Sequence, residues 1–416
     1  MVSGNFFSTK SGGVGGQLKR RYSDFIVEEI LESGRVCEAT RFLGKSEPAQ
    51  LRVPPREDER AQSQLLVDLE KINRDQNFCI SVLSRRLGCS RKRFGYAGLK
   101  DKRAITCQRI SIFQPDVQRL ESFSGQGMEL RNPEWSSERI EIGMLKGNRF
   151  TITMRDIALE EAEIRKRVQD CIEEMLSIGV PNYFGEQRFG GIRKITHLVG
   201  REFVKGDVEN AVMLYLTSVV PEEEEGVKAA RAALAESNDF GAALKNFDKK
   251  YRYERAIVGH LHTHPKDFAG AFRNLPKSMC YLFTHAYQSY LFNKTIDRRF
   301  EEGMGISKTD GDILVDGIPT APLAGYETVF SDGKAGEIEK AVLEEEGVSL
   351  SEFKISSMPE LSSRGARRQI ALFPENPQIV SVGEDEFFEG KRFCTVSFSL
   401  SRGNYATTVM REIIKQ

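Results

Sequence analysis

The sequence has no apolar run approaching the roughly 18–20 residues that a membrane-spanning helix needs, and its first residues lack the apolar centre of a secretory signal. We therefore expect a soluble, cytoplasmic protein with no membrane association. The seven cysteines are scattered, odd in number and without a C-x-x-C pair. Neither a disulfide framework nor a cysteine zinc site is predicted, and buried free thiols are the expectation.

An excess of charge of one sign is also absent, because 60 Lys and Arg balance 60 Asp and Glu. A neutral total argues against a nucleic-acid partner, but local positive surface, not the total, binds phosphate. Basic residues are most frequent between Ser84 and Arg109, where nine Lys or Arg accompany a single acidic residue, Asp101. The neutrality is therefore an average over acidic and basic segments.

A length of 416 residues predicts about two or three domains. Strand patterns lie near both ends, at 18–30, 106–113 and 391–400, while 200–300 and 335–355 follow helical periodicity. A strand pair is expected around a tight turn at Gly147-Asn148, and residues 45–66 are expected to form a loop. This distribution indicates a β-rich core assembled from both termini and interrupted by an inserted, mainly helical domain.

Three further helices are predicted from apolar spacing. One carries Ile80, Leu83 and Leu87 and ends at Gly88. Another covers 159–178 with a stripe of Ile164, Val168, Ile172 and Leu176, and the last runs through YATTVMREIIKQ at the C-terminus with Ala406, Val409, Met410 and Ile413 on one stripe.

Two segments resemble ligand-binding motifs, but neither has the complete set of residues that such a motif needs. Gly12–Gly16 has neither a preceding strand nor the lysine of a phosphate loop, so a flexible leader is the better interpretation. In GHLHTHP, His260, His262 and His264 would share a face on a strand, but only the first and third would do so on a helix. No carboxylate or cysteine completes the set, and we predict no metal site.

The stretch GYAGLKDKRAITCQRISI, residues 95–112, carries the strongest chemical signal. Its glycines allow tight backbone geometry, and Asp101 stands among cations just before a predicted strand. A carboxylate within a phosphate-attracting patch suits an enzyme that acts on RNA. From spacing alone, a turn aspartate that caps local backbone groups is the commoner explanation.

These residues resemble the catalytic motif of the TruD-type tRNA pseudouridine synthases, a G-L-K-D turn followed by R-A-x-T-x-Q. Four more stretches resemble the same family in the same order, so that the resemblance covers essentially the whole chain. They are GNRFTITMRD (147–156), PNYFGEQRFG (181–190), HAYQSYLFN (285–293) and NYATTVMREI (404–413).

The resemblance implies a role for five residues. Asp101 falls on the catalytic aspartate, Phe25 on an aromatic of the uridine pocket and Asn148 on a residue that hydrogen-bonds the target nucleotide. Tyr405 takes the position of a pocket aromatic that is often Phe in the family, and Lys19 is the expected basic residue of that pocket. Otherwise Phe25 and Tyr405 are core aromatics, and Asn148 is present only for its turn.

The resemblance also implies the fold, an α+β pseudouridine synthase core with a mixed, mainly antiparallel sheet and an inserted, largely helical α/β TRUD domain. Residues 1–184 and 375–416 would form the catalytic domain, and 185–374 the insertion. The implied reaction is isomerisation of a tRNA uridine, at position 13 in the D-arm, to pseudouridine. It breaks the N-glycosidic bond, rotates the base and rejoins it through C5 without a cofactor.

The implied partner is tRNA, bound by a monomer that requires no other protein. Candidate phosphate contacts are Arg85, Arg91, Lys92, Arg93, Lys100, Arg103, Arg193, Arg367 and Arg368. Two other classes of function remain open, a non-catalytic RNA-binding module and a nucleoside hydrolase. The intact Asp101, Phe25 and Asn148 argue against the first. The second usually needs paired carboxylates or a metal-activated water, and this motif has one carboxylate.

Overall fold

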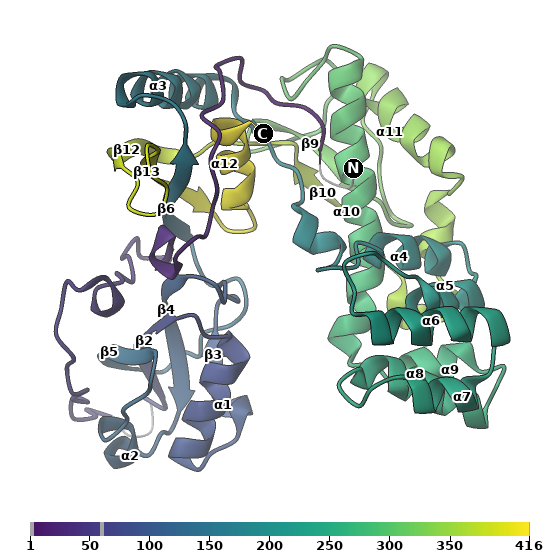
Figure 1. The fold of residues 1–416 in the computed structure, drawn as a ribbon, viewed down its shortest axis with the longest axis horizontal. Coiled ribbons are helices and arrows are strands. Elements are labelled where there is room, and N and C mark those ends of the chain that lie inside the picture. Colours follow the sequence, from purple (N-terminus) through teal and green to yellow (C-terminus); the bar gives the residue numbers. More distant parts are fainter. Residues whose placement is uncertain (1–3, 59–61, 416) are drawn as a thin grey trace. The chain divides into compact units, whose positions relative to one another are not determined.

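The structure is a computed structural model that describes residues 4–58 and 62–415 (Figure 1). The chain forms two compact units. The sheet unit contains Thr9–Ser177 and the chain from Phe373 onward, and the helical unit contains Ile178–Leu372 with the described residues up to Ser8. The sequence-based domain limits, 184/185 and 374/375, lie near these divisions and stay a prediction.

Eight strands form one sheet within the described part of the sheet unit, in the order β12-β13-β6-β1-β4-β2-β5 with β3 paired to β4. The pairing of β1 with β4 is parallel and the other strand pairs are antiparallel. The prediction of an α+β fold with a mixed, mainly antiparallel sheet is therefore confirmed. The strands are β1 (Phe25–Ile30), β2 (Gln64–Ile72), β3 (Phe94–Tyr96), β4 (Ile105–Phe113), β5 (Met128–Ser136), β6 (Gly147–Ile157), β12 (Glu375–Glu384) and β13 (Arg392–Ser401).

The two ends of the chain meet in this sheet, as predicted. Strand β13 pairs with β6, and β6 pairs with β1. The C-terminal helix α12 (Ala406–Ile414) follows β13, and its predicted stripe is buried. The remaining helices of this unit are α1 (Gln76–Leu87), α2 (Val117–Glu121) and α3 (Glu161–Ile178).

Helix α1 shows how local sequence sets an element's ends. The side chain of Asp75 accepts hydrogen bonds from the backbone N–H groups of Asn77 and Phe78, which satisfies donors left open by the first turn. Gly88 closes the helix with φ of +63°, a left-handed conformation that glycine adopts without a steric penalty. The predicted helix and its stop at Gly88 are confirmed.

The tight turn predicted at Gly147-Asn148 is wrong. Both residues lie at the start of β6, where Asn148 pairs with Glu29 on one side and Leu400 on the other. A Cβ atom on Gly147 would lie 2.2 Å from the carbonyl oxygen of Leu400. Glycine is therefore needed for the close approach of two strands and not for a turn.

Four other local predictions need correction. The leader at 12–16 is not free, because the N–H groups of Val14 and Gly15 donate to carbonyls at the end of α12 at 3.0 Å. Strand β1 begins only at Phe25, because Tyr22–Asp24 form a 3-10 turn. Strand β2 starts inside the expected 45–66 loop, and its apolar residues build the core under α1. On α3, Leu176 is 50% exposed, whereas Cys171 and Met175 are buried beside the other predicted positions.

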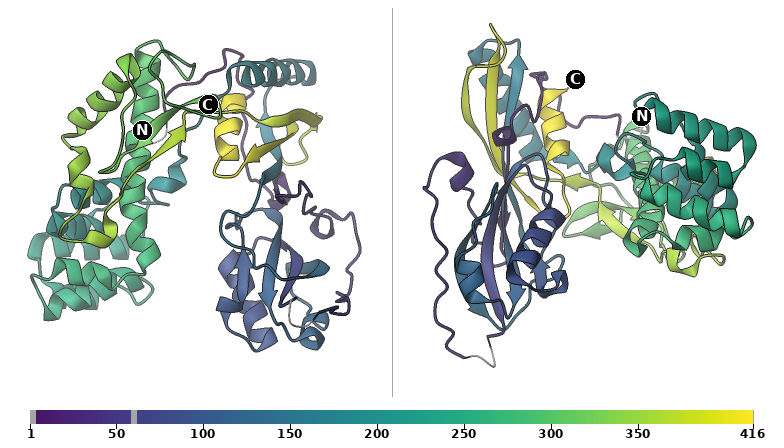
Figure 2. Two further views of the ribbon diagram at one scale, coloured as in Figure 1. Left: turned by 180° about the vertical axis from the view of Figure 1, so that it is seen from behind. Right: turned by 60° about the horizontal axis from the view of Figure 1, so that its bottom comes forward.

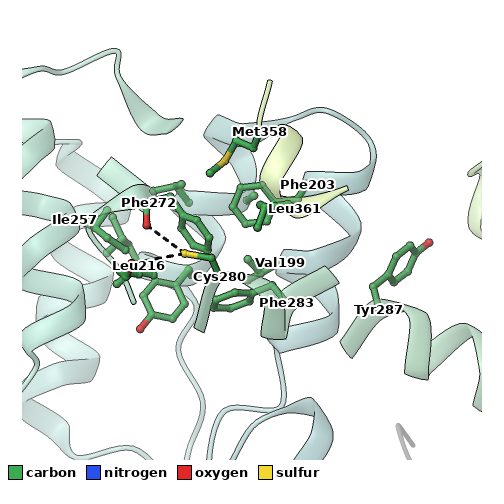
Figure 3. Packing of buried hydrophobic residues seen from close by; sticks show 14 of the residues in the cluster. Val199, Phe203, Leu216, Ile257, Phe272, Cys280, Phe283, Tyr287, Met358 and Leu361 are labelled. Carbon is green, nitrogen blue, oxygen red and sulfur yellow. Dashed lines mark hydrogen bonds between the residues drawn. The ribbon is translucent and has the colours of Figure 1, made fainter. Parts of the chain in front are cut away.

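The helical unit is built around its longest helix, α10 (Lys277–Glu301), which packs against α4 and α11 (Figures 1 and 2). Its core includes Phe203, Phe272 and Phe283, whose ring centroids lie 4.5–6.5 Å apart (Figure 3). The predicted helical middle of the chain is confirmed. The other helices are α4 (Thr196–Val204), α5 (Val208–Thr217), α6 (Glu225–Ser237), α7 (Phe240–Asn246), α8 (Arg252–Thr263), α9 (Phe268–Arg273) and α11 (Gly333–Glu346).

Short strands complete this unit. The strands β8 (Leu314–Val315), β9 (Ile318–Leu323) and β10 (Ala366–Gln369) form a sheet in the order β10-β9-β8, and β7 (Val180–Pro181) pairs with β11 (Ala371–Leu372). Across the described ranges of both units, no helix combines the length and apolar character needed to cross a bilayer. The seven cysteines are free thiols, six of them buried.

Candidate active site

Two polar side chains of the sheet donate hydrogen bonds to the backbone of the turn that carries Asp101. Gln108 on β4 donates from Nε2 to the carbonyl of Gly98 at 3.2 Å. Lys71 on β2, fully buried, donates from Nζ to the main-chain carbonyl of Asp101 at 2.7 Å. Burial lowers the pKa of Lys71 to about 8. These bonds fix the backbone of the turn directly before β4.

Lys100 and Glu29 form a buried ion pair beside this turn. Their Nζ and Oε2 atoms lie 2.7 Å apart, and the two side chains are 4% and 0% exposed. Burial raises the pKa of Glu29, while the Lys100 ammonium opposes that shift. Lys100 was among the candidate phosphate contacts, but its ammonium points into the protein because Glu29 offers it a desolvated partner.

Lys19, Phe25 and Asp101 come together at the surface of the sheet unit. The Lys19 Nζ lies 3.3 Å from Asp101 Oδ1 and 4.0 Å from the centre of the Phe25 ring. The Asp101 side chain is 37% exposed and that of Lys19 22%. Lys19 has φ of +59°, a left-handed conformation that costs a lysine free energy. The structure thus places one carboxylate against one ammonium over an aromatic ring.

Asn148 lies on the strand next to Phe25 and shares a sheet face with it. It pairs directly with Glu29, and alternate residues of β1 place Phe25 and Glu29 on the same side. The same register brings the rings of Phe25 and Phe150 to 6.4 Å, edge to face. The Asn148 Oδ1 atom is buried and has no hydrogen-bond partner among the described residues, so that its acceptor capacity is unused there.

The two predicted pocket aromatics differ in exposure. Phe25 is only 2% exposed, and its ring is covered by Lys19. Tyr405 is 39% exposed and stands at the N-cap of α12, in the loop after β13. Tyr405 is therefore the more exposed of the two aromatic residues, whereas the Phe25 ring lies against the Lys19 ammonium.

The remaining candidate phosphate contacts fall into two groups. Arg193, in the helical unit, is 12% exposed and donates to the Tyr215 carbonyl at 2.5 Å. Burial lowers the pKa of its guanidinium to about 10. Arg193 therefore serves internal packing rather than the surface. In the sheet unit Arg93 is half-buried, with its guanidinium 5.5 Å from the Phe113 ring, and the exposed candidates are Arg85, Arg91, Lys92 and Arg103.

Arg367 and Arg368, both in the helical unit, also have internal partners. Arg367 donates to Glu339 Oε1 at 2.5 Å, and Arg368 donates to Asn182 Oδ1 at 2.6 Å. The two guanidinium groups are therefore held in place by side chains of their own unit.

The histidine segment forms a helix, so that the alternation which would align three imidazoles does not arise. His260 and His264 stack with ring centroids 4.9 Å apart, and His260 bonds Asp267 at 2.8 Å. No group of three or more His, Cys, Asp or Glu side chains suited to a metal ion occurs within residues 4–58 and 62–415.

Lys71 and Glu29 are two site residues that sequence reasoning missed. Each is one of several charged residues in a mostly buried strand, Lys71 in QLLVDLEKI and Glu29 in FIVEEI. Charged residues are rarely buried without a partner. If both are buried, this rule predicts that each has a polar partner. The sequence does not identify these partners, because they come from distant parts of the chain.

The profile of the tRNA pseudouridine synthase D (TruD) family matches residues 1–317 and 316–413 of this sequence. The chain belongs to the TruD family. A tRNA pseudouridine synthase D of Methanosarcina acetivorans is 38% identical to it over 99% of this chain and 95% of its own length. One from Methanopyrus kandleri is 40% identical over 83% of this chain and 84% of its own length.

A solved TruD structure supports the fold. The crystal structure of a TruD protein from Methanosarcina mazei superposes on this chain with a TM-score of 0.80 at 36% identity, covering 100% of this chain and 97% of that one. The TruD resemblance inferred from the motifs is therefore confirmed, as is the predicted enzyme class, a tRNA pseudouridine synthase.

Proposed function

We propose that this TruD protein converts uridine 13 in the D-arm of tRNA to pseudouridine, with Asp101 as the catalytic carboxylate. The convergence of Asp101 with Lys19 and Phe25, two residues of a segment that lies 82 positions away in the sequence when counted from Lys19, carries the proposal. The Asp101 carboxylate is partly exposed and therefore accessible to a nucleotide. In the absence of a nucleotide it forms an ion pair with the Lys19 ammonium.

The reaction needs no external electron or group donor. The bond between uracil N1 and ribose C1′ breaks, a bond between C5 and C1′ forms, C5 loses a proton and N1 gains one. Asp101 can serve as a nucleophile toward C1′ or C6, or as the base that removes a sugar proton. Lys19 would orient the carboxylate in each case, because it contacts Oδ1 directly.

Uracil inside a folded RNA must leave its stack before Asp101 can reach it, at a cost of a few kcal/mol. Stacking on an aromatic side chain returns about 1–3 kcal/mol per base. The half-open ring of Tyr405 suits that role. The buried Asn148 Oδ1 acceptor suits a donor of the nucleotide, such as uracil N3–H.

Asp101→Asn is the direct test, with a tRNA transcript tritiated at uracil C5. The wild-type protein should release tritium while the base stays attached to the tRNA. The variant should lose turnover by at least ~10³-fold with tRNA affinity nearly unchanged, because an amide replaces the reactive carboxylate. A transcript with cytidine at position 13 is the matched control and should release no tritium.

Each other outcome contradicts one part of the proposal. Near-normal turnover by Asp101→Asn removes the catalytic assignment. Tritium release from the position-13 control removes the assigned nucleotide. Liberation of free uracil would indicate a hydrolase, and binding without either product would indicate a non-catalytic RNA-binding module.

A further inference from the structure

Two of the family-like stretches lie outside the unit that contains Asp101. Residues 181–190 and 285–293 belong to the helical unit, so the proposed chemistry gives them no role. They meet there in a cavity of about 230 Å³. The first stretch contributes Arg188 to the lining of this cavity. The second stretch contributes His285, Gln288 and Ser289, and the segment around the start of β10 contributes Ser363 and Ala366.

The cavity carries positive charge and no acid. None of its lining residues has a carboxylate. The charge comes from Arg188, whose guanidinium also lies 5.6 Å from the centre of the Phe184 ring. Burial lowers the pKa of the His285 imidazole, and the positive charge of Arg188 lowers it further. The imidazole is therefore neutral near pH 7 and adds no charge to the cavity.

Local hydrogen bonds hold the lining in position. Arg188 donates from Nε to Ser289 Oγ at 3.1 Å, and this hydroxyl donates to the His285 carbonyl at 2.8 Å. Gln288 donates from Nε2 to Ser363 Oγ at 2.8 Å. A site whose groups are fixed before binding loses less conformational entropy when a ligand arrives.

The loop before β10 needs a glycine to take this shape. Gly365 has φ of +93°, and a Cβ there would lie 2.4 Å from Thr328 Oγ1. Only glycine fits both constraints. The loop thus presents Ser363 and Ala366 to the cavity at defined positions.

We propose that this cavity binds a phosphodiester of the tRNA backbone, a contact separate from the uridine pocket. The inference rests on the proposed function, since it assumes that tRNA is the substrate. The Arg188 guanidinium and the Ser363 hydroxyl both line the cavity, and this hydroxyl accepts from Gln288 and can still donate its own hydrogen. Such donors suit phosphate oxygens. Pockets for drug-sized ligands measure about 300–1,000 Å³, and the smaller volume here suits a phosphate with part of its ribose. Such contacts position an RNA without reading its sequence.

Ala366→Glu tests the site without removing any existing contact. Ala366 is exposed on the edge strand β10 and lines the cavity, so that folding should tolerate a longer side chain. The new carboxylate should raise the Kd for a tRNA transcript modified by the wild-type protein about tenfold through like-charge repulsion. It should raise KM to a similar extent and leave kcat at saturating tRNA near normal. Ala366→Gln introduces a side chain of the same size without charge. It should raise the Kd at least fivefold less than Ala366→Glu does.

Arg188→Gln provides an independent measurement. Removal of the cation that neutralises one phosphate should reduce the slope of log K against log salt by about 0.7–0.9. Arg252→Gln, at an exposed arginine of the same unit that does not line the cavity, should leave the slope unchanged. Thermal unfolding of each variant checks that the helical unit remains folded.

Several outcomes would overturn the inference. Equal tRNA binding by Ala366→Glu and Ala366→Gln would do so, as would an unchanged salt slope in folded Arg188→Gln. If inorganic phosphate stabilises the wild-type protein but not Ala366→Glu, while both bind tRNA equally, the cavity binds free phosphate and not RNA. A wild-type protein that forms no pseudouridine contradicts the proposed function instead, so that the two failures are distinguishable.

Discussion

Two lysines position Asp101 through different atoms. Lys19 contacts the carboxylate, whereas Lys71 holds the main-chain carbonyl of the same residue. The first is partly exposed and can yield to a substrate, but the second is buried in the sheet. The backbone of the turn is thus fixed, while the side chain that we propose as catalytic remains partly exposed.

Replacement of Lys71 by Met should lower kcat about 10- to 100-fold, because a displacement of about 1 Å at a reacting group has an effect of that size. The Kd for tRNA should stay within about twofold, since Lys71 is buried away from any ligand. Single-turnover kinetics and equilibrium binding separate the two quantities.

Lys166→Met, at an exposed position on α3, is the control for the loss of one positive charge. A folded Lys71→Met protein with normal kcat would show that the bond to the Asp101 carbonyl has no part in positioning the carboxylate.

At the scale of elements, the packing of strands and of helices determines which residues each position accepts. Strands β6 and β13 approach so closely that Gly147 cannot carry a side chain. In the helical unit, α4 packs against α10 through aromatic rings, with His197 4.9 Å from Tyr290 and 5.4 Å from Phe189. Both arrangements produce measurable effects on stability.

Gly147→Ala should destabilise the sheet unit by about 1–3 kcal/mol, the usual penalty for forcing extra atoms into a packed region. The new methyl would lie 2.2 Å from a backbone oxygen that cannot move alone. Urea unfolding measures the change. Gly98→Ala, where nothing lies within 4 Å of the added Cβ, should stay within about 0.5 kcal/mol of wild type; equal stability of the two variants would refute the steric argument.

His197 should make the helical unit sensitive to acid. Burial lowers the pKa of its imidazole to about 4, with a smaller effect of Arg201 in the same direction and an opposing one from Glu346. Between the ordinary value of about 6.5 and 4, the unfolded chain binds a proton that the folded chain does not. Stability is therefore fully present above pH 6.5 and falls by about 3 kcal/mol as the pH drops to 4.

The measurement is the free energy of unfolding at several pH values for the wild-type protein and for His197→Phe. The variant keeps an aromatic ring between Phe189 and Tyr290 and has no group to protonate there. Its stability should fall less steeply between pH 6.5 and 4. Parallel curves for the two proteins would assign the acid sensitivity to other groups.

At the scale of the whole molecule, charge is segregated although its sum is zero. Acidic runs occur at Glu222–Glu225 and Glu344–Glu346, whereas Arg85, Arg91 and Lys92 are exposed together around α1. The local field, not the total, attracts a polyanion. A protein of zero net charge can therefore bind tRNA through one basic surface.

The Arg91→Gln/Lys92→Gln double variant should weaken tRNA binding at low salt. Its slope of log K against log salt should fall by up to about 0.9 for each phosphate that the variant no longer neutralises. Titrations between about 50 and 200 mM salt, a range over which such binding weakens greatly, provide the slope. Lys166→Gln should leave it unchanged, and an equal weakening in both proteins would show that general charge rather than this surface governs binding.

Local sequence alone determined the elements whose signals are local. Strand patterns predicted β4 and β13, and apolar spacing with Gly88 predicted α1. The resemblance of five stretches to the TruD family, and not their spacing, singled out Asp101 as the candidate catalytic residue. Helices and strands form from neighbouring residues, so that their patterns are readable along the chain.

Only the tertiary structure decided which charges point inward and which residues meet. Lys100 turns toward Glu29, Arg193 toward Tyr215, and Lys71 reaches the carbonyl of Asp101. Gly147 is required by a strand that lies more than two hundred residues away in the sequence. A buried charge needs a partner and two closely spaced strands need room for their backbones, and both are supplied by parts of the chain that no local pattern connects.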